Sequence, residues 1–146
     1  MKRRVLFVFV SVFAFVFTLA LTVPTASAKD LTKGDMVSAA KATICQVSVA
    51  EAKALLDKGG YIFLDVRTAK EFKMGHIPGA MHLARGLLEF KIAKAVPDKN
   101  ANIIICCKSG GRGCLATCTL CKMGYKNVKN MDGGWKAWTK AGYPIE

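Results

Sequence analysis

The run Ile103-Ile104-Ile105-Cys106 constrains the fold of this chain more than any other feature. Every residue in it is apolar, whereas a strand with one face in water alternates apolar and polar residues. The run therefore predicts a strand that is buried on both faces, as in a parallel sheet covered by helices on both sides. The glycine-rich segment 108–113 follows directly, and a predicted helix over 114–123 comes next. We expect strand, loop and helix in that order.

Strand-like and helix-like segments alternate along the rest of the chain. Ser48 with Glu51, and Thr68 with Glu71, have the spacing of a capping box, which marks the start of a helix. The other predicted helices are 87–95 and 135–141, and the other predicted strands are 44–47, 61–66, 81–83 and 128–131. Strands that alternate with helices predict an α/β domain with three layers, a central parallel sheet flanked by helices.

The first 28 residues have the pattern of a secretory signal peptide. Lys2 to Arg4 form a basic start, residues 5–23 are almost wholly apolar, and Ala26-Ser27-Ala28 is a cleavage pattern for signal peptidase. We therefore expect an exported protein of the bacterial periplasm, without stable membrane contact once the signal is cleaved. An uncleaved segment of this length would instead anchor the protein in the membrane. Residues 29–42 are expected to be a polar lead-in with a short helix, and 43–146 the folded domain.

Composition and charge exclude two classes of function. A hydrophobic content of 52% with 22% charged residues excludes a disordered chain. Without the three basic residues of the signal segment, the 22 Lys and Arg fall to 19 against 10 Asp and Glu, so the net charge falls from +12 to +9. The lysines are scattered rather than clustered with aromatic residues, and an exported chain meets little nucleic acid, so no nucleic-acid partner is expected. The charge is better suited to attracting small anions.

The loop after the buried strand carries the predicted chemistry. Cys107 stands at the carboxyl end of that strand, where open parallel sheets bind their ligands. The loop amides and the start of the next helix can converge on one point, and such surroundings favour a thiolate over a thiol. Cys107 is therefore the candidate nucleophile. The candidate anion-binding residues are Lys108, Ser109, Gly110, Gly111, Arg112 and Gly113.

With two other segments, this loop resembles the single-domain rhodaneses, the thiosulfate sulfurtransferases. Cys107 to Arg112 (Cys-Lys-Ser-Gly-Gly-Arg) is similar to the active loop of that family, whose usual form is Cys-Arg-Ser-Gly-Asn-Arg-Ser. The family's first motif is resembled by Leu64-Asp65-Val66-Arg67, Glu71-Phe72 and residues 75–80, and its last by Gly124-Tyr125, Asn127-Val128, Gly133-Gly134 and Trp138. The resemblance runs from about residue 44 to residue 146.

The resemblance implies a rhodanese-like fold and a persulfide mechanism. Cys107 would take the outer sulfur of thiosulfate and pass it to a thiophilic acceptor, while Arg112 and the loop amides hold the sulfite-like oxygens. The implied partners are a small anionic sulfur donor and a thiophilic acceptor, with no cofactor. Two residues depart from the family pattern, because Gly113 replaces a usual Ser or Thr and Cys106 stands where an aromatic residue is common.

Two alternatives stay open at this point. Cys106 and Arg112 have the Cys-x5-Arg spacing of cysteine phosphatases and some arsenate reductases, although the position of the glycines favours Cys107 as the nucleophile. The second alternative is a non-catalytic module that carries persulfide or binds a metal.

Other polar and thiol residues are assigned supporting roles. Asp65, Arg67 and Glu71 are expected to brace the strand end through ion pairs and hydrogen bonds, and His76 to brace a turn. Cys114, Cys118 and Cys121 fall on one side of the predicted helix, opposite a stripe of Ala116, Leu120 and Met123 that should face the sheet. The three cysteines are therefore expected at or near the surface. They are the only candidate metal ligands, and a sulfur relay, intermolecular disulfides or no role at all are the other interpretations.

Overall fold

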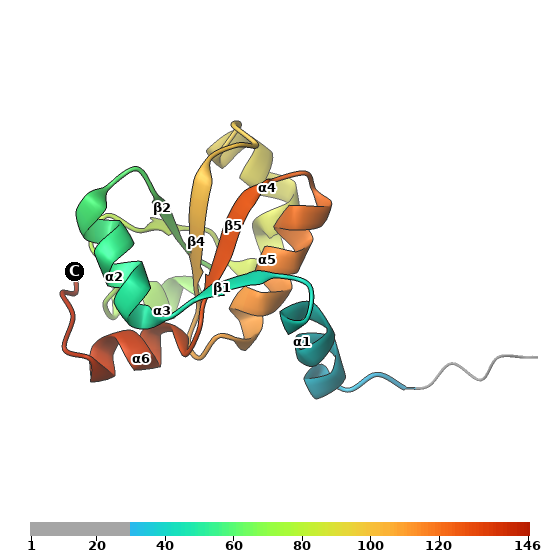
Figure 1. Ribbon diagram of the computed structural model, residues 1–146, viewed down its shortest axis with the longest axis horizontal. Helices are drawn as coiled ribbons and strands as arrows, with labels where there is room; N and C mark the ends of the chain where they lie inside the picture. Colours follow the sequence, from blue (N-terminus) through green and yellow to red (C-terminus); the bar gives the residue numbers. More distant parts are fainter. Residues whose placement is uncertain (1–29) are drawn as a thin grey trace, which may run out of the picture.

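The computed structural model describes residues 30–146, so the predicted signal peptide over residues 1–28 lies outside the described residues. A five-stranded, wholly parallel sheet forms the centre of the domain (Figure 1). Its strands lie in the order β1 (Cys45–Val47), β5 (Asn127–Met131), β4 (Asn102–Cys106), β2 (Ile62–Asp65) and β3 (Met81–His82). The buried run identified in the sequence is therefore the central strand, β4.

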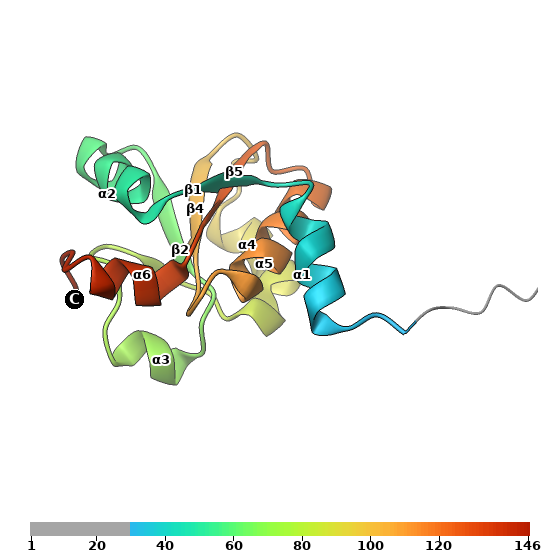
Figure 2. The same cartoon turned by 60° about the horizontal axis from the view of Figure 1, so that its bottom comes forward.

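Helices cover both faces of the sheet (Figures 1 and 2). α2 (Val49–Lys58) and α6 (Gly134–Lys140) lie over one face, and α1 (Lys33–Lys41), α4 (Leu88–Ala95) and α5 (Gly111–Lys122) over the other. The short helix α3 (Ala69–Lys73) follows β2, and a 3-10 turn over Arg85–Leu87 precedes α4. This arrangement confirms the predicted fold class, three layers with a central parallel sheet.

Capping boxes begin three of the helices. The two that the sequence predicted are present, at Ser48 with Glu51 and at Thr68 with Glu71. A third begins α1, where the Thr32 amide donates to Asp35 Oδ2 at 2.9 Å and the Asp35 amide donates to Thr32 Oγ1. Asp35, at the third helical position, thus accepts the hydrogen bond that a glutamate more usually accepts in a capping box. The short helix expected in the lead-in is therefore a capped helix, and it packs against α5.

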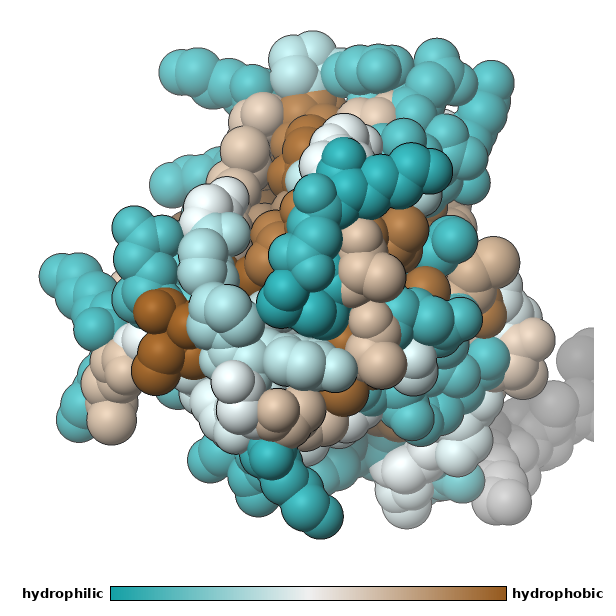
Figure 3. All heavy atoms as spheres, turned by 60° about the vertical axis from the view of Figure 1, so that its left-hand side comes forward, coloured by the Kyte–Doolittle hydropathy of each residue, from teal (hydrophilic) through white to brown (hydrophobic). Residues whose placement is uncertain are grey.

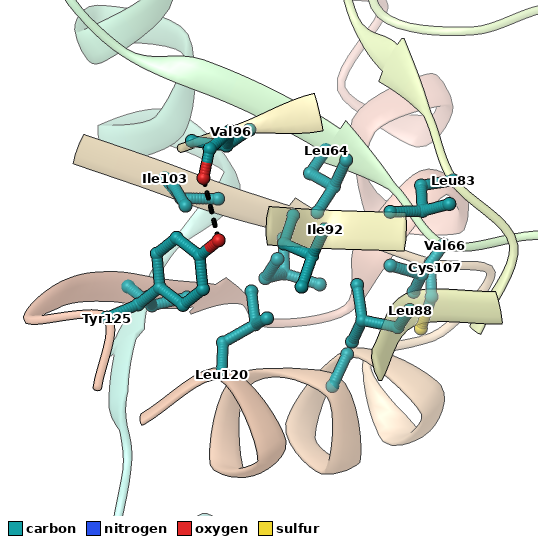
Figure 4. Packing of buried hydrophobic residues seen from close by; sticks show 13 residues of the cluster. Leu64, Val66, Leu83, Leu88, Ile92, Val96, Ile103, Cys107, Leu120 and Tyr125 are labelled. Carbon is teal, nitrogen blue, oxygen red and sulfur yellow. Dashed lines mark hydrogen bonds between the residues drawn. The ribbon is translucent and has the colours of Figure 1, made fainter. Parts of the chain in front are cut away.

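The sheet separates two buried apolar clusters, and β4 contributes to both. Ile103, Ile105 and Cys107 face the cluster under α4 and α5, which Figure 4 shows together with the hydrogen bond from Tyr125 Oη to Val96 O. Ile104 and Cys106 face the cluster under α2 and α6. The predicted burial of this strand on both faces is confirmed. Since side chains alternate along a strand, the two adjacent cysteines lie on opposite sides of the sheet.

The boundary between loop and helix differs from the sequence prediction. The predicted loop runs to Gly113, but α5 begins at Gly111. Gly110 has a φ of +92°, which favours glycine, and the Cys114 amide donates to its carbonyl oxygen at 2.8 Å. The positive φ at Gly110 turns the chain into the helix earlier than the sequence pattern indicates.

Within residues 30–146, no helix combines the length and the apolar character needed to span a membrane. On the face that comes forward in Figure 3, the hydrophobic residues occupy separate small areas among polar side chains.

Candidate active site

The Cys107 sulfur lies in a cradle of backbone amides at the carboxyl end of β4. The amides of Gly110 and Gly113 donate to Cys107 Sγ at 3.2 and 3.1 Å. The residue is only 1% exposed and packs at the end of the apolar cluster, next to Val66 and Leu88 in Figure 4. Two N–H donors aimed at one sulfur stabilise negative charge on it. The geometry of the loop therefore favours a negative charge on the sulfur of Cys107.

The start of α6 holds the carbonyl groups of the same loop. The Trp135 amide donates to Cys107 O at 2.7 Å, and the Lys136 amide donates to Lys108 O at 3.0 Å. Gly134, with a φ of +57°, lies so close that a Cβ atom there would stand 2.3 Å from Cys107 O. Because these carbonyl oxygens are engaged with α6, the amides of the loop are left to face Cys107 Sγ.

Asn130 explains why glycine follows Arg112. A Cβ atom on Gly113 would lie 2.2 Å from Asn130 Oδ1 and 3.3 Å from Asn130 Cγ. Asn130 is fully buried on β5, so its amide cannot move away without disturbing the sheet. The space that a Ser or Thr side chain would need is therefore filled by Asn130, a residue that the sequence analysis did not single out.

Arg112 is paired with Glu71. Its Nη1 and Nη2 donate to Glu71 Oε2 and Oε1 at 2.8 and 2.7 Å, and the two side chains are 35% and 28% exposed. The hydrogen bonds from Arg112 hold the pKa of Glu71 well below its usual range, and those to Glu71 raise the pKa of Arg112. Glu71 also caps α3 through Thr68. Glu71 was expected to brace the strand end through ion pairs and hydrogen bonds, and its ion pair joins it to Arg112 at the start of α5.

Asp65 and Arg67 form a buried ion pair beside the site. Arg67 Nη2 lies 2.7 Å from Asp65 Oδ2, and Nε donates to both carboxylate oxygens. The guanidinium also donates to Gly75 O and lies over the ring of Trp135, 4.5 Å from its centroid. This ion pair therefore connects the end of β2, the turn before β3 and the start of α6.

His76 packs within that turn. Its ring stacks on Phe72 with centroids 3.8 Å apart, and Nδ1 lies 3.2 Å from Phe72 O. Its backbone exchanges two hydrogen bonds with Glu146 near the end of the chain. Neither the ring nor the backbone of His76 contacts the cradle of Cys107 in these interactions.

A pocket of about 240 Å³ opens onto the loop. Its lining residues come from the loop and from two helices: Cys107, Lys108, Ser109, Gly111, Arg112, Leu115, Lys33 and Val37. The amides of Gly111 and Arg112 precede the first hydrogen bond of α5, so they have no acceptor within the helix and can bind an anion. Lys33 and Val37 of α1 were missed, because nothing in a polar lead-in indicates that it folds back onto a loop about 75 residues later.

Cys106 has different surroundings from Cys107. It is fully buried in the cluster under α2 and α6, and its burial raises the pKa of the thiol well above the usual range. Within the described residues, the only hydrogen bond of its side chain runs from Sγ to Cys107 O at 3.7 Å. The structure therefore does not bring Cys106 to the pocket that Arg112 lines.

The expectation that three cysteines of α5 lie at or near the surface is wrong for Cys114. Cys121 is exposed and Cys118 half-buried, but Cys114 is fully buried, and Asn130 Nδ2 donates to its sulfur at 3.3 Å. Burial raises the pKa of Cys114 and of Cys121. Within residues 30–146 no group of three or more His, Cys, Asp or Glu is placed to hold a metal ion. The predicted opposite stripe does face the core, where Ala116 and Leu120 are buried and Met123 packs against them.

Comparisons with known proteins agree with this geometry. Residues 48–141 match the family model of the rhodanese-like domain. The chain is 35% identical over 117 residues to Rhodanese-like domain-containing protein 17 of Arabidopsis thaliana, with 70% of this chain and 73% of that protein covered. It is 38% identical over 110 residues to Thiosulfate sulfurtransferase 16 of the same plant, with 68% and 91% covered. A solved structure from Rhodopseudomonas palustris, described as a protein of unknown function and possible tyrosine phosphatase, has a TM-score of 0.76 at 30% identity and covers 82% of this chain and 97% of its own.

Proposed function

The chain belongs to the rhodanese-like domain family, and on that premise we propose that it is a sulfurtransferase that carries sulfane sulfur on Cys107. Its donor is thiosulfate or a similar small sulfur anion, and its acceptor is a thiophilic compound. The signal-peptide pattern of residues 1–28 supports a transfer outside the cytoplasm.

In the first step Cys107 takes up sulfur. The thiol loses its proton to solvent, and the thiolate attacks the outer sulfur of thiosulfate. A new S–S bond forms on Cys107 while the S–S bond of thiosulfate breaks, and its electron pair leaves with sulfite. The free amides of Gly111 and Arg112 and the charge of Lys108 hold the sulfite oxygens during this step.

In the second step the sulfur leaves. A nucleophilic acceptor such as cyanide or a thiolate attacks the outer sulfur of the persulfide, and the electron pair of the broken bond returns to Cys107 as thiolate. Between the steps, the amides of Gly110 and Gly113 stabilise the sulfur anion. The atoms and charges balance without a cofactor, an oxidant or a reductant.

The observation that carries this proposal is the pair of amide hydrogen bonds to Cys107 Sγ. The phosphatase alternative needs Cys106 at the centre of such a cradle, and Cys106 is buried on the opposite side of the sheet. The similar Rhodopseudomonas palustris structure, described as a possible tyrosine phosphatase, keeps that alternative worth a direct measurement.

The experiment is thiosulfate-dependent cyanolysis by the purified protein. We expect repeated release of thiocyanate, and Cys107→Ser should lower the rate by roughly 10³-fold or more, because the serine hydroxyl is a far weaker sulfur nucleophile. Mass spectrometry after incubation with thiosulfate should show one added sulfur atom on wild type and none on Cys107→Ser.

Three results would contradict the proposal in different ways. A single stoichiometric burst of thiocyanate from wild type indicates a persulfide carrier instead of an enzyme. Absence of both turnover and the sulfur adduct contradicts sulfur chemistry at Cys107. If wild type hydrolyses p-nitrophenyl phosphate and Cys106→Ser does not, the result supports the alternative of a phosphatase with Cys106 as its nucleophile.

A further inference from the structure

Helix α1 forms one wall of the pocket at Cys107. Lys33 and Val37, which are one turn apart on this helix, line the pocket together with the loop. Val37 approaches the loop closely, since a Cβ atom on Gly111 would stand 3.7 Å from Val37 Cγ2. α1 lies before the residues 48–141 that match the family model. The pocket is therefore completed by a segment that the family domain does not include.

α1 is held in place at more than one point. Ala40 is buried, the helix packs along α5, and Lys41 Nζ lies 3.2 Å from Asp132 Oδ1. Asp132 directly precedes the Gly133-Gly134 turn that packs against the loop. The helix and the loop are thus fixed against the same turn, so the distance from Lys33 to the loop is set by the fold.

The charge of Lys33 has no partner among the residues that the structure describes, 30–146. Among residues 30–146, neither Lys33 nor Lys108 has a hydrogen bond or ion pair at its side-chain nitrogen, whereas Arg112 is engaged by Glu71. The positive charge available to a bound anion therefore comes from the two lysines rather than from the arginine.

Lys33 also stands where a lysine does not help the helix. It is the first residue of α1, at the end where the helix dipole is positive and a cation is unfavourable by a few tenths of a kcal/mol. A lysine at this position is therefore not explained by helix stability. Its position in the pocket lining explains it, because a cation there can bind an anion.

We propose that Lys33 is a specificity-determining residue of the active site, which selects acceptors that carry an anionic group beyond their reactive sulfur. Lys33 binds the anionic group, such as a carboxylate, and the short carbon chain between that group and the sulfur lies over Val37 and Leu115. The pocket volume of about 240 Å³ leaves room for a compound larger than thiosulfate. This inference rests on the proposed sulfur transfer at Cys107 and adds the class of its acceptor.

The test compares two small thiols as acceptors, 3-mercaptopropionate with a carboxylate and 2-mercaptoethanol without one. Thiosulfate is kept saturating, because in a two-step transfer kcat/KM for the acceptor then reports the second step alone. Wild type should prefer the carboxylate-bearing thiol. In Lys33→Glu the ratio of the two kcat/KM values should fall about tenfold through reversal of the charge, and in Lys33→Gln by a smaller factor.

Lys126→Glu is the matched control. It makes the same change in net charge at an exposed residue just before β5, at the amino-terminal edge of the sheet and away from the pocket. We expect its acceptor ratio to equal that of wild type. An unchanged ratio in Lys33→Glu, or an equal fall in both Lys33→Glu and Lys126→Glu, overturns the inference. Absence of turnover with every acceptor in wild type contradicts the proposed function instead, so the two failures are distinguishable.

Discussion

Cys106 and Cys107 are neighbours in sequence and almost equally buried, at 0% and 1% exposure, yet their surroundings differ completely. Cys106 packs in the apolar cluster under α2 and α6, and its thiol donates to Cys107 O at 3.7 Å. Cys107 directly follows β4, and two backbone amides, of Gly110 and Gly113, donate to its sulfur. Burial raises the pKa of Cys106 and keeps it a thiol.

The difference between the two cysteines therefore lies in the backbone amides that donate to Cys107 Sγ, and not in exposure. A strand turns successive side chains to opposite faces, so only one of two adjacent cysteines can meet the loop that follows the strand. In this fold the loop curls toward the face that α5 covers, and Cys107 is the residue on that face.

Apart from the loss of Cys107 itself, the largest expected effect comes from filling the space next to the Cys107 cradle. Gly113→Ser places a Cβ atom 2.2 Å from Asn130 Oδ1, so the loop or β5 must shift. We expect a loss of about 1–3 kcal/mol in unfolding free energy and roughly tenfold or more in kcat/KM for thiosulfate. Urea unfolding and steady-state cyanolysis measure the two effects.

Two further variants show whether Asn130 is the cause. Gly113→Ser combined with Asn130→Ala should recover much of the lost activity, because the obstructing amide is gone. Gly111→Ala is the matched control, since its Cβ atom would meet nothing closer than 3.7 Å and its φ is not positive. A Gly113→Ser protein with wild-type activity and stability would show that the cradle tolerates the displacement.

Substitution of the other cysteine should have an intermediate effect, on stability alone. Cys106→Ser puts a hydroxyl into an apolar cluster, which we expect to cost about 1–3 kcal/mol of unfolding free energy. The kcat/KM for thiosulfate should stay within about twofold of wild type, in contrast to the loss in Cys107→Ser. Cys106→Ala, which adds no polar group, gives the same test if the serine variant folds poorly. A large loss of turnover in both folded variants would contradict the assignment of Cys107 as the sole nucleophile.

The smallest expected effect concerns the ion pair at the edge of the cradle. Arg112 holds the pKa of Glu71 well below its usual value of 4.5. The Glu71 carboxylate therefore contributes to stability above that value, and this contribution is lost as the pH falls from there toward the pKa of the folded state. At pH 7, the unfolding free energy of wild type should exceed that of Glu71→Gln by at most about 1 kcal/mol, because the ion pair is partly exposed. The difference should be smaller at pH 3. Equal differences at both pH values in urea unfolding would show that the charge of Glu71 is not the cause.

The sequence indicated the elements of the fold with good accuracy, and it did so through local signals. The apolar run of β4 and the capping boxes of α2 and α3 each depend on residues close together in the chain, and each is present. The prediction was less accurate where the signal had another form, as in the Thr32–Asp35 cap of α1, or where one residue decided a boundary, as at Gly110.

The environment of the α5 cysteines shows why helix periodicity was insufficient to predict which of them are buried. The periodicity of α5 identified the stripe of residues that faces the sheet. A second side of the helix is also covered, by α1 and by Asn130 of β5. Cys114 is buried for that reason. Periodicity within one helix cannot indicate how many neighbours cover it, because that number depends on elements far away in the chain.

By itself, the sequence determined the order of strands and helices, the parallel sheet and the loop that carries Cys107, because hydrophobic patterning, caps and glycine turns act over a few residues. Only the tertiary structure decided that Arg112 is paired with Glu71, that Asn130 requires glycine at 113, and that Lys33 reaches the pocket. The residues that these contacts join are at least 17 positions apart, by their numbers in the chain. They exist only once the sheet and its two layers of helices have assembled, since packing brings such residues together and local preference does not.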